Sequence, residues 1–321
     1  RSGLTALLQE HVYLAGIATG TALGGGDNAT QVAALDANSV ALSKAITSVY
    51  GDEAGTQFLA LWRKHIGFFV DYTVGKATKD DAKVEKARTD LEGYSSDFGA
   101  FIDSATEGAL PKAAVVANLS EHVKTLFAAI DAQAAGSPDA TALLKKAADH
   151  MSMTAKVLSG AFSTQFPEKF SGNVEDGASE LRAGLTGLLQ EHVYLAGITT
   201  NTALTGGDFK VPAGVLDTNT IGLSDAIGSV YGDAAGEQFK ALWRKHIGFF
   251  VDYTTGKATN DKAGVEKARA DLDGYRADFG AFLASANPEN ITKQAIVDDL
   301  KAHVESLELA IDAQAKEAAK K

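Results

Sequence analysis

The chain has 321 residues, a formal net charge of −11 and no cysteine. The negative charge disfavours binding to nucleic acid or to an anionic lipid surface. The lack of cysteine excludes disulfides, thiolate metal sites and thiol catalysis. No apolar run approaches the length of a membrane span, and a content of only five prolines favours helical structure.

Helical spacing of apolar residues predicts six helices in the first half of the chain. The first is expected over residues 4–23 and ends at a run of glycines, and the second ends at Tyr50. The third begins at Asp52 as its N-cap, and the fourth follows Asp81. Pro111 opens the fifth, and the sixth runs from Asp139 to Phe166.

Two stretches of this sequence occur a second time at a constant offset of 181 residues. LWRKHIGFFVDYT occupies 61–73 and 242–254, and LLQEHVYLAGI occupies 7–17 and 188–198. The offset indicates a tandem duplication. We expect residues 1–166 to form copy 1 with six helices, 167–180 to form a polar linker, and 181–321 to form copy 2 with five helices.

A shorter repeat lies inside each copy, because every odd helix carries a histidine at the same phase. The even helices share a second pattern, in which Leu35, Leu91 and Met151 occupy equivalent places. Copy 1 is therefore an array of three helical hairpins, and copy 2 has two and a half. Stacked hairpins build either two compact bundles or one continuous solenoid. The polar linker favours an all-α protein of two bundles.

Six histidines lie on the apolar stripes of the odd helices. They are His11, His65, His122, His192, His246 and His303. The simpler interpretation is that each is a buried polar anchor that the duplication has copied. The alternative is that histidines from adjacent hairpins converge on a metal or a haem. Duplication copies anchors and ligands alike, so the pattern leaves both open.

A seventh histidine, His150, is followed by Met151, and this pair of ligand types suits copper. Met153 points to another helix face and cannot join the same helical site. No Glu-x-x-His spacing supports a di-iron bundle, and no nucleophile motif is present. The sequence therefore predicts no enzyme, with copper or haem as the alternative to having no cofactor.

The fifth helix of copy 2 has no sixth helix after it in the sequence. Its apolar stripe consists of Leu300, His303, Leu307 and Ile311. Exposing such side chains would cost roughly 1.5–3 kcal/mol each relative to burial. We therefore expect a protein partner or a second copy of the chain to cover this C-terminal helix face, or the fifth helix to be rearranged. Trimming of the C-terminus is the alternative explanation.

The motifs LWRKHIGFFVDYT, SVYGDEA, DHMSMTAKVLSGAF and QFPEKF resemble a group of exported bacterial helical-repeat proteins. Their genome labels sometimes mention a copper amine oxidase N-terminal region. The resemblance implies an all-helical fold and an extracellular or cell-envelope location after removal of a signal peptide. The expected function is a non-enzymatic scaffold, assembly unit or binding module, and the alternative is copper or haem binding through the repeated histidines.

Overall fold

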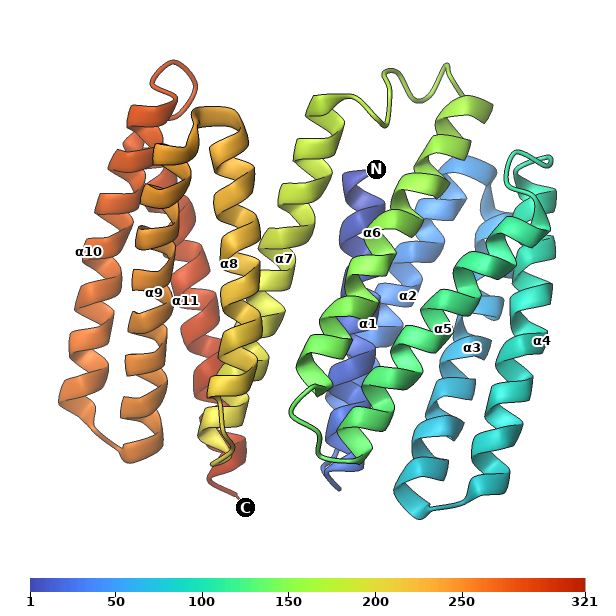
Figure 1. Cartoon of the computed structure of the whole chain (residues 1–321), viewed down its shortest axis with the longest axis horizontal. Helices are drawn as coiled ribbons and strands as arrows, with labels where there is room; N and C mark the ends of the chain where they lie inside the picture. The colour runs from blue at the N-terminus through green and yellow to red at the C-terminus, as the bar shows by residue number, and fades with distance from the viewer. Residues whose placement is uncertain (321) are drawn as a thin grey trace. The chain divides into compact units, whose positions relative to one another are not determined.

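The computed structural model describes residues 1–320, and these form eleven α-helices and no strand (Figure 1). The helices are α1 (Ser2–Leu23), α2 (Ala29–Tyr50), α3 (Asp52–Thr78), α4 (Asp81–Ala105), α5 (Lys112–Ala134), α6 (Ala140–Gln165), α7 (Gly177–Leu204), α8 (Lys210–Tyr231), α9 (Asp233–Thr259), α10 (Lys262–Ala286) and α11 (Lys293–Ala318). The all-helical fold class expected from the sequence is confirmed. No helix within residues 1–320 is long and apolar enough to cross a membrane.

Helix ends follow local chemistry. Asp80 caps α4 by accepting a hydrogen bond from the Lys83 amide at 3.0 Å. Gly51 separates α2 from α3 with φ of 88°, a conformation that glycine adopts without steric cost. Gly51, rather than Asp52, is therefore the N-cap of α3, and Asp52 is its first helical residue. The first helix also begins earlier than expected, at Ser2.

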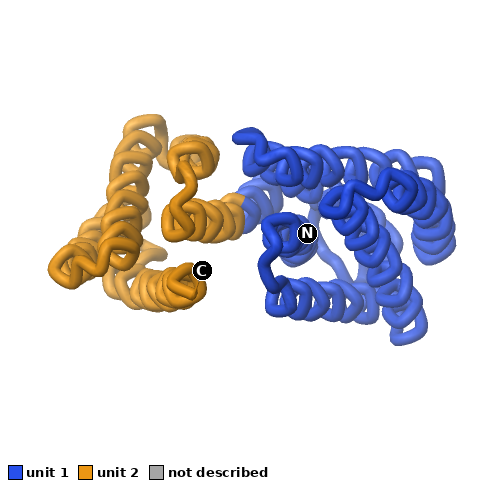
Figure 2. The backbone as a smooth tube through the Cα atoms, turned by 90° about the horizontal axis from the view of Figure 1, so that it is seen from below, with its two compact units in different colours: residues 1–187 blue, residues 188–321 orange. Residues whose placement is uncertain are grey.

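The chain divides into two compact units, residues 1–187 and 188–321, coloured separately in Figure 2. The segment 166–176 joins α6 to α7, and the division between units falls within α7. Each unit is described below by itself.

Unit 1 is a bundle with an inner and an outer set of helices. The odd helices α1, α3 and α5 contact one another, and each even helix packs between two odd helices. Contact between α6 and α1 closes the bundle. At that contact a Cβ on Gly16 would lie 2.3 Å from Leu144, so glycine permits the close approach. This arrangement directs the apolar stripes of the odd helices, with their histidines, to the centre.

Unit 2 repeats this pairing without a sixth helix. The helices α8, α9, α10 and α11 contact in sequence, and α11 also contacts α9. The side chain of Asn219 on α8 donates to the carbonyl of Leu188 on α7 at 2.8 Å. Thr200 on α7 donates to Gln314 on α11 at 2.8 Å.

The expectation that the α11 stripe has no cover is wrong for three of its four residues. Leu300, Leu307 and Ile311 are buried. Leu307 and Ile311 belong to a core cluster with α9 and α10 that includes Phe250 and Leu272. The stripe packs inward against the other helices of its own unit.

Candidate metal centres

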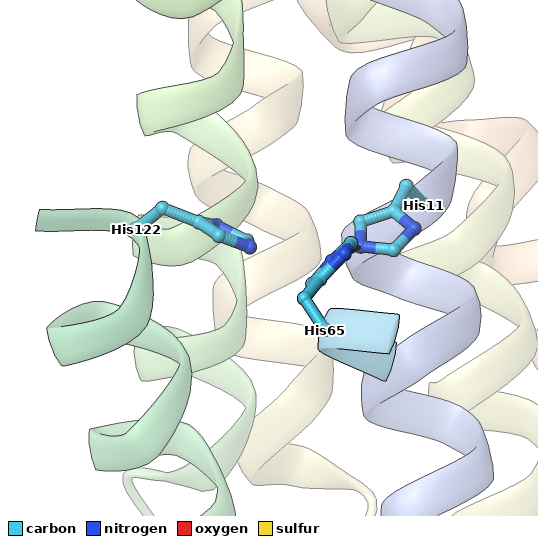
Figure 3. Close-up of side chains that lie close together, drawn as sticks. All are labelled: His11, His65 and His122. Atoms are coloured by element: carbon cyan, nitrogen blue, oxygen red, sulfur yellow. Dashed lines mark hydrogen bonds between the residues drawn. The ribbon is translucent and has the colours of Figure 1, made fainter. Parts of the chain in front are cut away.

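The three odd helices of unit 1 each direct one histidine to the same point on the bundle axis. Figure 3 shows the imidazoles of His11, His65 and His122 turned toward one another from α1, α3 and α5. The three residues are 1%, 2% and 3% exposed. One ring nitrogen from each lies within 4.8 Å of the other two. His11, His65 and His122 lie far apart in the sequence. They meet because each occupies the same position in its hairpin and therefore faces the bundle axis.

The closest pair of nitrogens has the spacing of a hydrogen bond between two imidazoles, and also that of two ligands on one ion. Nε2 of His65 lies 3.3 Å from Nε2 of His11. In a tetrahedral zinc site with Zn–N bonds of 2.0–2.1 Å, two ligand nitrogens are about 3.3–3.4 Å apart. His122 is more distant, with ring centroids 6.1 Å from His11 and 6.4 Å from His65. A small inward shift of His122 would complete a three-nitrogen set.

Aromatic side chains surround the histidines. The Trp62 ring lies 4.6 Å from His65 and 4.9 Å from His11, and Tyr94 stacks on His65 at 5.1 Å. Trp62 is 5% exposed and Tyr94 2% exposed. These rings restrict the orientation of the imidazole planes.

Burial keeps all three imidazoles neutral. It lowers the pKa of His11 to about 3 and the pKa of His122 to about 4. The pKa of His65 also lies well below its usual value, mainly through burial and then through the neighbouring His11 and His122. Neutral imidazole is the form that binds metal. The ligands therefore need to release no proton before they bind an ion at pH 7.

Several ring nitrogens in this group have no hydrogen-bond partner among the described residues. They are Nδ1 of His11 and both nitrogens of His122, whereas a hydrogen bond with the backbone of Trp62 raises the pKa of His65 against the effect of burial. A buried polar atom without a partner costs about 1–3 kcal/mol, and such atoms often mark an ion or a water. In His11 the Nε2 atom meets Nε2 of His65 and the Nδ1 atom lacks a partner, whereas in His122 both nitrogens are free to take up a ligand.

Unit 2 contains the same arrangement. His192, His246 and His303 form a second group whose nitrogens lie within 4.8 Å of one another, and Nε2 of His246 lies 3.3 Å from Nε2 of His192. Burial lowers the pKa of His192 to about 3. His303 is only partly buried, whereas its equivalent His122 is buried. The second site is thus the more open of the two.

The residues one turn before the third histidine differ between the units. Asn118 precedes His122 in unit 1, and Asp299 precedes His303 in unit 2. Burial lowers the pKa of His303, while the nearby charge of Asp299 raises it. The sequence repeat contains this difference, but only the structure shows that it lies beside a histidine group.

The structure does not bring His150 and Met151 into either group. His150 Nε2 makes a 3.0 Å contact with the carbonyl oxygen of Asn118. Met151 is 3% exposed and belongs to the core, and Met153 is 64% exposed. The two methionines lie on different helix faces, as their spacing indicates, and a copper site at His150 and Met151 stays a prediction from the sequence.

Two cavities flank the histidines of unit 1. The first, which we name the axial chamber, has a volume of about 70 Å³ and is lined by all six helices. Leu8, Ile46, Trp62, Phe98, Leu119 and Met151 represent one helix each, and His122 also lines it. Its α1 and α3 residues precede His11 and His65 in sequence, so it lies on one side of the histidines along the bundle axis.

The second cavity, the side cavity, has a volume of about 340 Å³ and lies on the opposite side of the histidines. It is lined by His11 and by residues that follow His11 and His65 in sequence, such as Phe69. Arg63 and Asp36 also line it and form a two-pronged ion pair at 2.7 and 2.9 Å, with about half of each side chain exposed. A site reached through a solvated cavity has the entry path that an ion requires.

Searches found no family model that matches the chain, and no similar curated protein or solved structure. The functional assignment therefore depends on the geometry of the two histidine groups.

Proposed function

We propose that the chain binds two transition-metal ions, one in each histidine group, and that copper is the ion these groups fit best. The observation that carries the proposal is the convergence of three neutral imidazoles in each unit, with unpartnered nitrogens among them. All three are buried in unit 1, whereas His303 of unit 2 is half-buried. A core anchor would need only one hydrogen-bonded histidine per hairpin. It would not require three rings to meet.

The donor set narrows the choice of ion. Imidazole nitrogen suits copper, zinc, nickel and iron, and copper binds most strongly among divalent ions. The groups contain no carboxylate among their ligand atoms within the described residues. An ion in unit 1 therefore keeps its full charge among buried side chains. Because the idealised cost of burying an ion rises with the square of its charge, Cu(I) costs about a quarter of what a divalent ion costs.

Haem fits this geometry poorly. Two axial histidines on a haem iron lie on opposite faces of the porphyrin ring. A third imidazole whose nitrogen is within 4.8 Å of both would occupy the plane of the ring. Trp62 and Tyr94 also fill the space beside His65. We therefore retain a bare metal ion and not haem.

The proposal agrees with the broader expectation of a binding module that is not an enzyme. Export, and a role as a scaffold or assembly unit, stay predictions from the sequence. The burial of Leu300, Leu307 and Ile311 removes the main physical reason for self-association through α11.

Copper uptake tests the proposal directly. Untagged, metal-free protein is titrated with Cu(I) in competition with a chromophoric chelator, and two equivalents are expected. His65→Ala and His246→Ala should each lose about one equivalent. His150→Ala, which changes a histidine outside both groups, should retain two. Retention of two equivalents by both His65→Ala and His246→Ala would contradict the proposal.

The two tryptophans separate the sites. They are the only tryptophans in the chain, and each lies beside one group, with Trp243 4.5 Å from His246. In a Trp62→Phe variant the remaining emission reports unit 2, and in Trp243→Phe it reports unit 1. Each variant should show a fluorescence change that saturates at its own site.

A further inference from the structure

Helix α7 of unit 2 exposes side chains that the same sequence buries in unit 1. The stretch LLQEHVYLAGI occurs once in α1 and once in α7. Leu8 and Val12 of α1 are 2% and 0% exposed, whereas their equivalents Leu189 and Val193 of α7 are 46% and 43% exposed. Because the residues are identical, the difference comes from what packs on the helix and not from the helix itself.

Helix α11 continues this exposed surface with small residues. Three buried residues of α5 have exposed equivalents on α11, three or four positions apart, so they share one helix face. The pairs are Thr125 and Ser306, Ala129 and Ala310, and Ala132 and Ala313. Gln314 joins α11 to α7 by donating to the carbonyl of Gly197 at 3.0 Å. We call Leu189, Val193, Gly197 and the three exposed α11 residues the α7–α11 face.

Unit 1 shows what covers the equivalent surface. There α6 packs against both α1 and α5, and no described helix follows α11 to do the same in unit 2. Leu144 of α6 fills the notch at Gly16, where a Cβ would lie 2.3 Å from it. At the equivalent Gly197 the nearest neighbour of a Cβ is Gln314 at 4.0 Å, so this notch is open.

The side chains of α6 define the kind of helix that fits. Five of its eight buried residues are small, which lets helix axes approach closely. They are Ala147, Ala148, Ala155, Ser159 and Ala161. Leu144 adds the one branched side chain that the glycine notch receives. An occupant of the α7–α11 face therefore needs an apolar stripe of small residues with a leucine near one end.

One charge separates this occupant from α6 itself. In unit 1 Thr154 of α6 donates to the side-chain oxygen of Asn118 at 2.9 Å. The equivalent of Asn118 in unit 2 is Asp299, which is exposed. A carboxylate at this place attracts a basic side chain more strongly than a hydroxyl. The matching helix should therefore carry a lysine or an arginine where α6 has Thr154.

We infer that the α7–α11 face of unit 2 binds a helix of a partner protein, with the small apolar stripe of α6 and a basic side chain opposite Asp299. Docking of an apolar helix face into a groove between helices is a common mode of peptide recognition. The partner helix takes the place that α6 has in unit 1 and covers the half-buried His303. The inference needs no metal, so it is independent of the proposed function.

A peptide of residues 138–167, which contains α6, is the probe. It carries a fluorophore, and its anisotropy is followed as the metal-free full chain is added; one bound peptide per chain is expected. The Thr154→Lys peptide should bind at least threefold more tightly. Asp299→Asn in the chain should remove that gain.

Two variants of the chain locate the binding. Gly197→Leu fills the notch and should weaken binding at least tenfold. Val193→Lys, at an exposed position, should do the same and keeps the test valid if Gly197→Leu does not fold. Gly248→Leu is the matched control, because Gly248 is an exposed helical glycine with open space around its Cβ; it should leave binding unchanged.

Absence of saturable binding would overturn the inference, and so would a second copy or another part of the chain that already covers the face, since either would exclude the peptide. Undiminished binding in Val193→Lys would also overturn it. A lysine peptide that binds Asp299→Asn as tightly as the unmodified chain would overturn the charge requirement. None of these outcomes affects the copper titration, which tests the proposed function separately.

Discussion

His122 and His303 occupy the same position of the duplicated sequence, but His122 is buried and His303 is partly exposed. The difference follows from α6, which packs against α5 and α1 in unit 1 and has no counterpart after α11 among the described residues. The two groups thus share a ligand set and differ in access.

Metal should leave unit 2 faster than unit 1. Because the histidine group of unit 2 is more open to solvent, a chelator should remove its metal about tenfold faster. This factor corresponds to ~1.4 kcal/mol in the activation barrier. Stopped-flow fluorescence of the metal-loaded Trp62→Phe and Trp243→Phe variants measures the two rates separately. Equal rates would show that α6 does not control access.

The residues Asn118 and Asp299 should tune the charge that each site prefers. Asp299→Asn removes a negative charge one turn from His303 and should weaken Zn²⁺ binding to unit 2 by about threefold to tenfold. This loss of affinity is at or below the loss that usually follows removal of an outer-shell partner of a metal ligand. The reason is that Asp299 is exposed, so solvent and salt screen its charge. Asn118→Asp should strengthen Zn²⁺ binding to unit 1. Cu(I) affinity should change less in both variants, since the ion carries half the charge.

Acid should destabilise the metal-free bundle well above the range in which carboxylates titrate. The pKa values of His11 and His122 are lowered to about 3 and about 4 in the folded protein, against an ordinary value near 6.5. Above pH 6.5 these histidines are neutral in both the folded and the unfolded chain, so the free energy of unfolding has its full value. It falls between pH 6.5 and 4, where the unfolded chain binds protons that the folded chain does not.

Each such histidine lowers the free energy of unfolding by about 1.4 kcal/mol per pH unit in that window. Denaturant unfolding followed by the Trp62 emission of Trp243→Phe measures the slope for unit 1. Replacing His65 by Phe removes one proton-binding group and should make the slope shallower by that amount. NMR titration of the histidines with ordinary values near 6.5 would rule out this account.

A matched pair of glycines tests the packing of α6. In unit 1 a Cβ on Gly16 would lie 2.3 Å from Leu144, whereas the nearest neighbour of a Cβ on the equivalent Gly197 is Gln314 at 4.0 Å. Gly16→Ala should destabilise by about 1–3 kcal/mol through overpacking. Gly197→Ala should stabilise by up to about 1 kcal/mol, because alanine favours helix. Thermal unfolding gives both signs, and a stabilising Gly16→Ala would show that the α1–α6 contact is loose.

Much of the fold follows from the sequence because hairpins repeat with one phase. The constant offset predicts the duplication, and the apolar stripes predict the helices and the inward direction of His11, His65 and His122. Spacing along a helix does not give the distance between helices, so it leaves anchor and ligand indistinguishable. That choice depends on the contacts among α1, α3 and α5, which bring the nitrogens within 4.8 Å.

One sequence-based expectation fails and another stays a prediction, and both concern how the helices pack. The stripe of α11 was expected to lack cover, but α9 and α10 supply part of it because a bundle wraps around its odd helices. His150 and Met151 have suitable donor atoms, but they lie on α6, an even helix outside the inner set. A sequence shows which side chains have donor atoms. Whether a helix belongs to the inner set of odd helices depends on how the helices pack.

Every ligand of both histidine groups comes from an odd helix, and each hairpin contributes one. A single ancestral hairpin would thus have offered one imidazole, too few to hold an ion, and two hairpins would have offered a pair. Ion retention by three donors becomes available to natural selection only at the third repeat. Because no even helix contributes a histidine to either group, a change in an even helix can alter access to the imidazoles without altering the imidazoles themselves.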